Sequence, residues 1–129
     1  MKDWIYVGLF LDDKSKRFLK RLYSIPRGWK EYYDHMTVVF NDGSQFAEEI
    51  KSVNEKHFHK RLTLKVIAVG ISEKAMALKV ELPGGIVCAN KIPHITLGTS
   101  LEGKPVDSND ITNWHNIGWT FTVTGSMHE

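Results

Sequence analysis

The sequence predicts an α+β fold in which helices pack outside a sheet, within a single domain over residues 1–129. Strand-like alternation and helical periodicity follow one another along the chain. Its length of 129 residues suffices to bury a hydrophobic core. A four-residue phrase that begins at His35 recurs 59 residues later, at His94, which indicates two half-domains related by pseudo-symmetry. We therefore expect a concave sheet face that holds both phrases in one cleft.

The first half of the chain reads as two strands, each followed by a helix. Residues 4–11 alternate as the residues of a half-buried strand do. Asp12 then offers an N-cap for a helix that ends before Pro26. Residues 34–40 form the next strand, and residues 45–58 form the second helix. The side chains expected on the buried face of that helix are Phe46, Ala47, Ile50 and Val53.

The second half reads as a hairpin followed by two more strands. The hairpin pairs residues 62–72 with residues 75–82. Pro93 then introduces a short strand over residues 94–98, which carries the second copy of the phrase. The remaining segments expected are a polar loop at 99–109, a helical turn at 110–114, a last strand at 119–125 and a frayed tail at 126–129.

The composition is that of an ordinary globular protein and excludes several classes. The net charge of +2 permits an anionic ligand, but a protein that binds long nucleic acid mainly by charge would carry a denser basic stripe. No apolar run approaches the length of a membrane span, and the N-terminus has no signal-peptide layout. The single Cys88 rules out an internal disulfide and a multi-cysteine metal site. We expect a cytoplasmic monomer with no membrane contact and no obligate protein partner.

The repeated phrase carries the chemistry. It reads His35-Met36-Thr37-Val38 in one strand and His94-Ile95-Thr96-Leu97 in another. Residues two apart in a strand point to the same face, so each phrase presents an imidazole beside a hydroxyl and turns its apolar residues into the core. Two such presentations supply a general base, a general acid and two hydroxyl donors for an anion. That set suits hydrolysis of a phosphodiester without a metal or another cofactor.

The two phrases resemble the paired H-x-T/S-hydrophobic signature of the two-histidine (2H) phosphoesterase superfamily, and the resemblance covers nearly the whole chain in order of elements. Pro93, Gly103-Lys104-Pro105 and Ser108-Asn109 add a resemblance to the branch that includes the cyclic phosphodiesterase domain of tRNA ligases. The resemblance implies a bilobal fold, in which two pseudo-symmetric antiparallel sheet lobes form a concave cleft with helices packed outside. It also implies that His35 and His94 are the acid–base pair and that Thr37 and Thr96 hold the phosphate.

Three further residues are candidates for substrate binding. Tyr6 lies on the strand face opposite Val7 and Leu9, from which it could stack on a base or bond a phosphate, although a surface tyrosine fits the same pattern. Lys104 and Asn109 lie in the polar loop after the second phrase, where binding residues often occur, but a solvated lysine and a helix cap are equally simple readings. No metal site is expected, because the His-x-His at residues 57–59 has no third ligand nearby in sequence.

The sequence therefore predicts a metal-independent phosphodiesterase that acts on a small nucleotide or an RNA end. The superfamily leaves several substrates open: a 2′,3′-cyclic phosphate end, a cyclic dinucleotide such as cGAMP cleaved by a viral immune-evasion enzyme, or a 2′-5′ oligonucleotide. The compact gap between the phrases favours a small substrate or a nucleotide end. The alternative is a non-catalytic module that binds RNA or a nucleotide in the same cleft. Which histidine is the acid and which the base is left open at this point.

Overall fold

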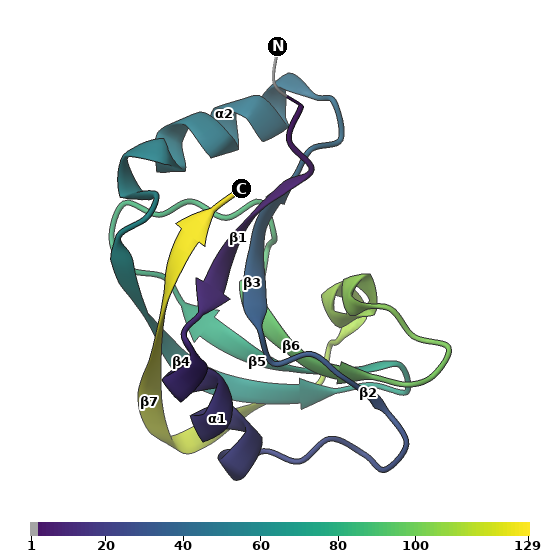
Figure 1. Ribbon diagram of the computed structural model, residues 1–129. Helices are drawn as coiled ribbons and strands as arrows, with labels where there is room; N and C mark the ends of the chain where they lie inside the picture. Colours follow the sequence, from purple (N-terminus) through teal and green to yellow (C-terminus); the bar gives the residue numbers. More distant parts are fainter. Residues whose placement is uncertain (1–2) are drawn as a thin grey trace.

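The computed structural model describes residues 3–129 and contains one antiparallel sheet with two α-helices (Figure 1). The strands are β1 (Tyr6–Leu11), β2 (Lys30–Glu31), β3 (His35–Phe40), β4 (Arg61–Ile71), β5 (Ala75–Glu81), β6 (His94–Thr99) and β7 (Trp114–His128). The helices are α1 (Asp13–Leu22) and α2 (Gln45–Asn54), with short 3₁₀ helices η1 (Glu55–His57) and η2 (Pro105–Asp110). An α+β fold is thus confirmed.

The sheet closes on itself. Its strand order is β2-β6-β3-β1-β7-β4-β5, and β5 also pairs with β6, so all strands except the edge strand β2 form a barrel. The expected division into two sheet lobes is absent from the hydrogen-bond pattern, because the strands make one continuous sheet. Closure is nevertheless uneven: β3 and β6 share the single register pair Met36–Ile95, whereas β4 and β7 pair along most of their length.

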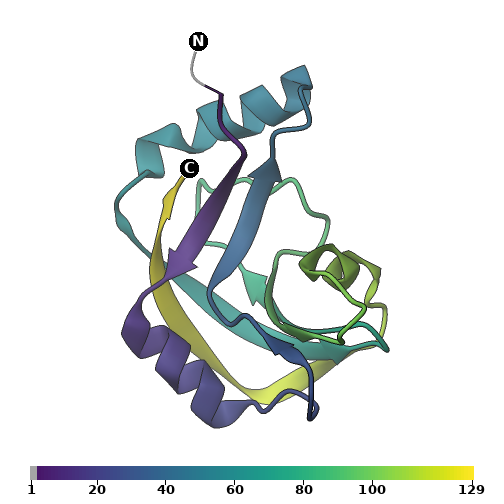
Figure 2. The same ribbon diagram turned by 45° about the vertical axis from the view of Figure 1, so that its right-hand side comes forward.

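The two helices lie at opposite ends of the barrel (Figures 1 and 2). Asp12 caps α1 by accepting a hydrogen bond from the Ser15 N–H at 2.8 Å, and Leu19 of this helix is fully buried in the core. Ser44 caps α2 by accepting from the Ala47 N–H at 3.1 Å. Both α-helices therefore pack their buried residues against the interior of the barrel, and the 3₁₀ helix η2 lies over part of the outer face of β6.

The buried face of the second helix differs from the prediction. Phe46 and Val53, expected in the core, are 57% and 48% exposed, and the buried residues are Ala47, Ile50 and Asn54. The Asn54 amide explains this rotation. Its Nδ2 donates to the Ile50 and Val87 carbonyls at 2.9 and 2.7 Å, and its Oδ1 accepts from the Val87 N–H at 3.0 Å. The α-helix ends at this anchor, four residues earlier than predicted.

The C-terminal segment also differs. The last strand extends from Trp114 to His128 instead of residues 119–125. Of the tail expected to fray, Ser126, Met127 and His128 pair with β1, and Ser126 also pairs with β4. Met127 is fully buried opposite Leu9 of β1, and its carbonyl accepts from the His59 N–H at 3.0 Å. The helical turn lies at residues 105–110, ahead of its predicted position. Among residues 3–129 no helix is long and apolar enough to span a bilayer.

Candidate active site

The Met36–Ile95 pair brings the two phrases together on one face of the sheet. Both residues are fully buried, so their neighbours in sequence point to the outer face of the barrel. In an antiparallel pair, the residue before Met36 then lies beside the residue after Ile95. His35 is accordingly the neighbour of Thr96, and Thr37 is the neighbour of His94. In this register the two imidazoles occupy diagonal positions of the strand pair, and the four side chains line one pocket.

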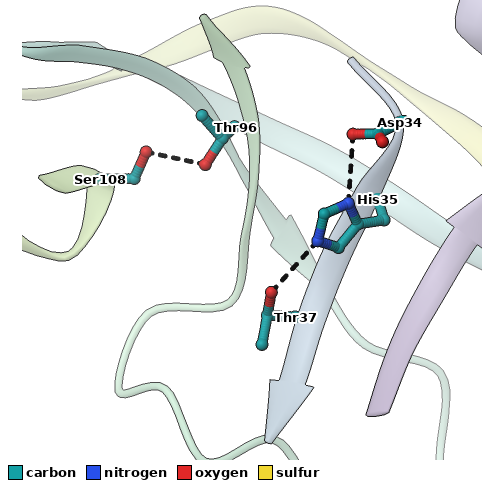
Figure 3. Close-up of polar contacts among 5 residues, drawn as sticks. All are labelled: Asp34, His35, Thr37, Thr96 and Ser108. Atoms are coloured by element: carbon teal, nitrogen blue, oxygen red, sulfur yellow. Dashed lines mark hydrogen bonds and ion pairs between the residues drawn. The ribbon is translucent and has the colours of Figure 1, made fainter. Parts of the chain in front are cut away.

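His35 is held by the residues on either side of it in the chain. Its Nδ1 lies 3.1 Å from Asp34 Oδ1, and its Nε2 lies 3.3 Å from Thr37 Oγ1 (Figure 3). Adjacent residues of a regular strand point to opposite faces, so the contact with Asp34 requires a break in the extended chain. Asp34 lies in a bend before β3 begins at His35, and the preceding Tyr33 has a left-handed φ of 58°. This hydrogen bond lowers the pKa of the Asp34 carboxyl below its ordinary value, which keeps the carboxylate charged beside the ring.

His94 occupies a different environment. It is only 7% exposed, and its Nδ1 lies 2.8 Å from the Ile92 carbonyl oxygen. A carbonyl only accepts, so Nδ1 carries a proton and the neutral ring keeps a free lone pair on Nε2. Burial lowers the pKa of His94 below its ordinary value of 6.5, and the Ile92 carbonyl offsets part of this effect. The two histidines therefore differ: one faces a carboxylate and the other a neutral carbonyl in a dry site.

The threonine hydroxyls also have partners. Thr96 Oγ1 lies 2.9 Å from the hydroxyl of Ser108, a residue of η2 that is 1% exposed (Figure 3). If Ser108 donates in this bond, the Thr96 hydrogen is free to point elsewhere. On β3, the Thr37 carbonyl accepts from Asn90 Nδ2 at 3.4 Å, which ties the strand to the segment that precedes β6.

A pocket of about 340 Å³ lies over the four side chains. The segment at Ala89–Asn90 and the helix η2 provide its walls. Of the residues singled out from the sequence, His35, Thr37, His94, Thr96 and Asn109 line this pocket together.

Tyr6 and Lys104 lie outside the lining of the pocket. The Tyr6 ring lies 5.6 Å from the His35 ring, on the neighbouring strand β1, so it contacts a site residue from the side. Lys104 precedes η2, where its backbone N–H donates to Asp107 at 2.8 Å, and its side chain is not part of the pocket wall. The helix η2 presents Pro105, Val106 and Asn109 to the pocket, so contact of Lys104 with a phosphate stays a prediction.

Three site residues were missed by the sequence reasoning: Asp34, Asn90 and Ser108. Asp34 directly precedes the first phrase, so its position was a usable signal, but strand parity argued that it points away. Asn90 lies in an irregular segment and Ser108 in the short 3₁₀ helix η2, and neither segment has a periodicity that assigns a direction to a side chain. Within residues 3–129, no group of three or more histidine, cysteine, aspartate or glutamate side chains is arranged to hold a metal ion.

Comparisons with known proteins show the family and the fold of the chain. Residues 14–125 match the family model described as "Fungal tRNA ligase phosphodiesterase domain". The solved structure of a fungal RNA kinase superposes with a TM-score of 0.70 at 17% identity, covering 98% of this chain and 45% of that one. The chain thus spans less than half of that protein, and at this identity the likeness concerns the fold. No curated protein matches the chain.

We expect the His94 ring to titrate below 6.5 because burial disfavours its charged form. Between the lowered pKa and the ordinary one, the unfolded chain binds more protons than the folded chain, so stability falls as the pH falls through this window. NMR titration of the ring measures the pKa, and ¹⁵N shifts report the tautomer, which should carry its proton on Nδ1. A pKa at or above 6.5, or a proton on Nε2 of the neutral ring, would contradict this description.

Proposed function

Because the chain belongs to the family of fungal tRNA ligase phosphodiesterase domains, we propose that it is a metal-independent phosphodiesterase that opens a 2′,3′-cyclic phosphate at an RNA end. One observation carries the proposal: two imidazoles and two hydroxyls from adjacent antiparallel strands line a single pocket. The pocket is built from one chain, which supports action as a monomer. The local symmetry about Met36–Ile95 supports a pseudo-symmetric origin of the two phrases, although the sheet is continuous.

His94 is the general base in this proposal. Its Nδ1–H is held by the Ile92 carbonyl and its lowered pKa keeps Nε2 unprotonated near neutral pH, so Nε2 can take a proton from the attacking water. The water oxygen then forms a bond to phosphorus. A general acid must begin protonated, and a pKa lowered by burial is unfavourable for that role. We therefore assign the role of general base to His94 and that of general acid to His35.

His35 is the general acid. The charged Asp34 carboxylate accepts from Nδ1 and orients the ring, so that Nε2–H can protonate the departing ribose oxygen as the ring P–O bond breaks. One water is consumed, one phosphomonoester forms, and the proton taken up by His94 balances the proton given by His35. The diagonal placement of the rings suits this reaction, because the entering and leaving oxygens stand roughly in line on opposite sides of phosphorus. Diagonal positions in an antiparallel pair are about 7–8 Å apart, comparable to a phosphate with a hydrogen bond on each side.

Thr37 and Thr96 hold the non-bridging oxygens. Ser108 donates to Thr96 Oγ1, which directs the Thr96 hydrogen to the phosphate, and the Thr37 hydroxyl donates to a second oxygen while the Nε2–H of His35 serves the leaving group. Hydroxyl donors fixed in advance stabilise charge as it develops and need no reorganisation during the reaction. Ser108 is thus a positioning residue that acts through Thr96.

The family model favours an RNA end over the other substrates that the two phrases allow, namely a cyclic dinucleotide or a 2′-5′ oligonucleotide. The alternative is a module that binds RNA or a nucleotide in this pocket without turnover. The complete set of four residues supports the enzyme.

We expect hydrolysis of a 2′,3′-cyclic phosphate RNA end to continue in EDTA, because the acid, the base and the anion donors are all side chains. Turnover of a panel that contains cyclic-phosphate RNA, a cyclic dinucleotide and 2′-5′ oligoadenylate measures both activity and substrate class. Loss of all turnover in EDTA would overturn the metal-free mechanism. Tight binding without turnover of any member would establish the non-catalytic module.

We expect His35→Ala and His94→Ala each to lower kcat by about 10²–10⁴-fold, the usual contribution of a general acid or base. His115→Ala is the matched control, since this exposed histidine of β7 does not line the pocket. Single-turnover kinetics and circular dichroism separate chemistry from folding. Near-parental kcat in either site variant, with the fold intact, would remove that histidine from the mechanism.

A further inference from the structure

A row of residues crosses the outer face of the sheet from the active site to a basic pocket. His35 of β3 is the register partner of Phe10 on β1, Phe10 is the partner of Ser126 on β7, and Ser126 is the partner of Arg61 on β4. Direct partners in antiparallel strands face the same side, so all four point outward. Three strand spacings separate His35 from Arg61, a distance of about 14 Å.

Stacked rings follow the same row. The Phe10 ring lies 5.4 Å from the His35 ring at 28° and 4.4 Å from the His128 ring at 18°. His59 continues the stack, at 5.8 Å and 8° from His128. We call Phe10, His128 and His59 the stacking row. Gly8 leaves room for it, since a Cβ there would lie 2.9 Å from the Phe10 ring.

The far end of the stacking row, at His59, is exposed and has a fixed backbone. His59 is exposed and has a left-handed φ of 63°, which is uncommon for a residue with a side chain, and its N–H is fixed by the Met127 carbonyl at 3.0 Å. A depression of about 340 Å³ lies beside it, lined by Phe10, Asp12, His59, Arg61 and Ser126 among others. Asp12 is the acid in this depression, and its carboxylate accepts hydrogen bonds from the Ser15 N–H and the Thr124 hydroxyl.

Arg61 joins this depression to a larger one. A pocket of about 420 Å³ on the far side is lined by Arg61 together with Lys14, Arg17 and Arg21 of α1. All four cations are exposed, and within residues 3–129 none of them is paired with a carboxylate. Exposed cations beside a stacking surface are the combination that binds single-stranded nucleic acid: the cations follow the phosphates and the rings stack on the bases.

We propose that the stacking row and this basic pocket form a track for the RNA strand that precedes the cyclic phosphate. The terminal nucleotide enters the active site, the strand passes along the outward edges of the row, one base stacks on the open face of the exposed His59 ring, and the phosphates reach Arg61 and the cations of α1. The charge complementarity and the continuity with the His35 pocket favour this occupant. The inference rests on the proposed function for its substrate end, but the track itself is a binding surface that can be tested without turnover.

The test compares a long and a short substrate. We expect Arg61→Ala and His59→Ala to raise KM for a hexauridylate that ends in a 2′,3′-cyclic phosphate by roughly five- to a hundredfold, the range of one stacked base. Hydrolysis of uridine 2′,3′-cyclic monophosphate should change by less than about twofold, since that ligand does not reach the track. The matched controls are Arg27→Ala and His115→Ala, exposed residues that line neither depression. Equal effects on both substrates, or equal effects of the controls, would overturn the track.

Direct binding separates failure of the track from failure of the proposed function. Fluorescence anisotropy with a labelled hexauridylate requires no hydrolysis, and Arg61→Ala should reduce the slope of log K against log salt by about 0.7, the value for one phosphate contact on a single strand. If no substrate is hydrolysed but this slope changes, the proposed function fails and the track stands. If the cyclic mononucleotide is hydrolysed and the slope is unchanged, the track fails and the proposed function stands.

Discussion

The arrangement of the active site depends on one cross-strand pair. Met36 and Ile95 are fully buried opposite each other, and this pair sets both the face and the register of the two phrases. Because the side-chain period of a strand is two, a slip of β3 or of β6 by one residue would turn the imidazole of that strand into the core. The pair is also the single register contact between β3 and β6, so the barrel is least tightly closed where the pocket lies. Buried apolar contacts therefore fix the positions of four polar side chains, while the loose seam beside them leaves room for a ligand.

The local environments of the two histidines then divide their roles. The Asp34 carboxylate holds Nδ1 of His35, whereas burial favours the neutral ring at His94 and the Ile92 carbonyl fixes its proton on Nδ1. Neither environment comes from the phrase itself. Asp34 contacts His35 from the bend that precedes β3, and the segment before β6 supplies the Ile92 carbonyl. Two similar phrases thus acquire different chemistry from their surroundings, as general acid–base catalysis requires.

Strand periodicity was sufficient to predict the face of His35, Thr37, His94 and Thr96, because parity in a strand is a short-range property. Periodicity was insufficient for Asp34, which lies in a bend before β3 begins. It was also insufficient for Asn90 and Ser108, which lie outside the strands. The same limit explains the C-terminal tail. The segment Ser126–His128 looks polar and short, but its backbone pairs with β1 and Ser126 also pairs with Arg61 of β4. Met127 is buried by this pairing. The closure of the barrel through β5 and β6 is likewise a long-range pairing that no local pattern encodes.

The proposed acid–base mechanism requires the two imidazoles to act on opposite sides of one phosphate. A crystal structure of the protein with uridine and vanadate, which imitates the five-coordinate phosphorus of the reaction, tests it most directly. We expect vanadium in the pocket over β3 and β6. One apical oxygen should be hydrogen-bonded to His35 Nε2 and the other to His94 Nε2, and the threonine hydroxyls should contact the equatorial oxygens. Vanadate bound by one imidazole alone, or by both from the same side, would contradict it.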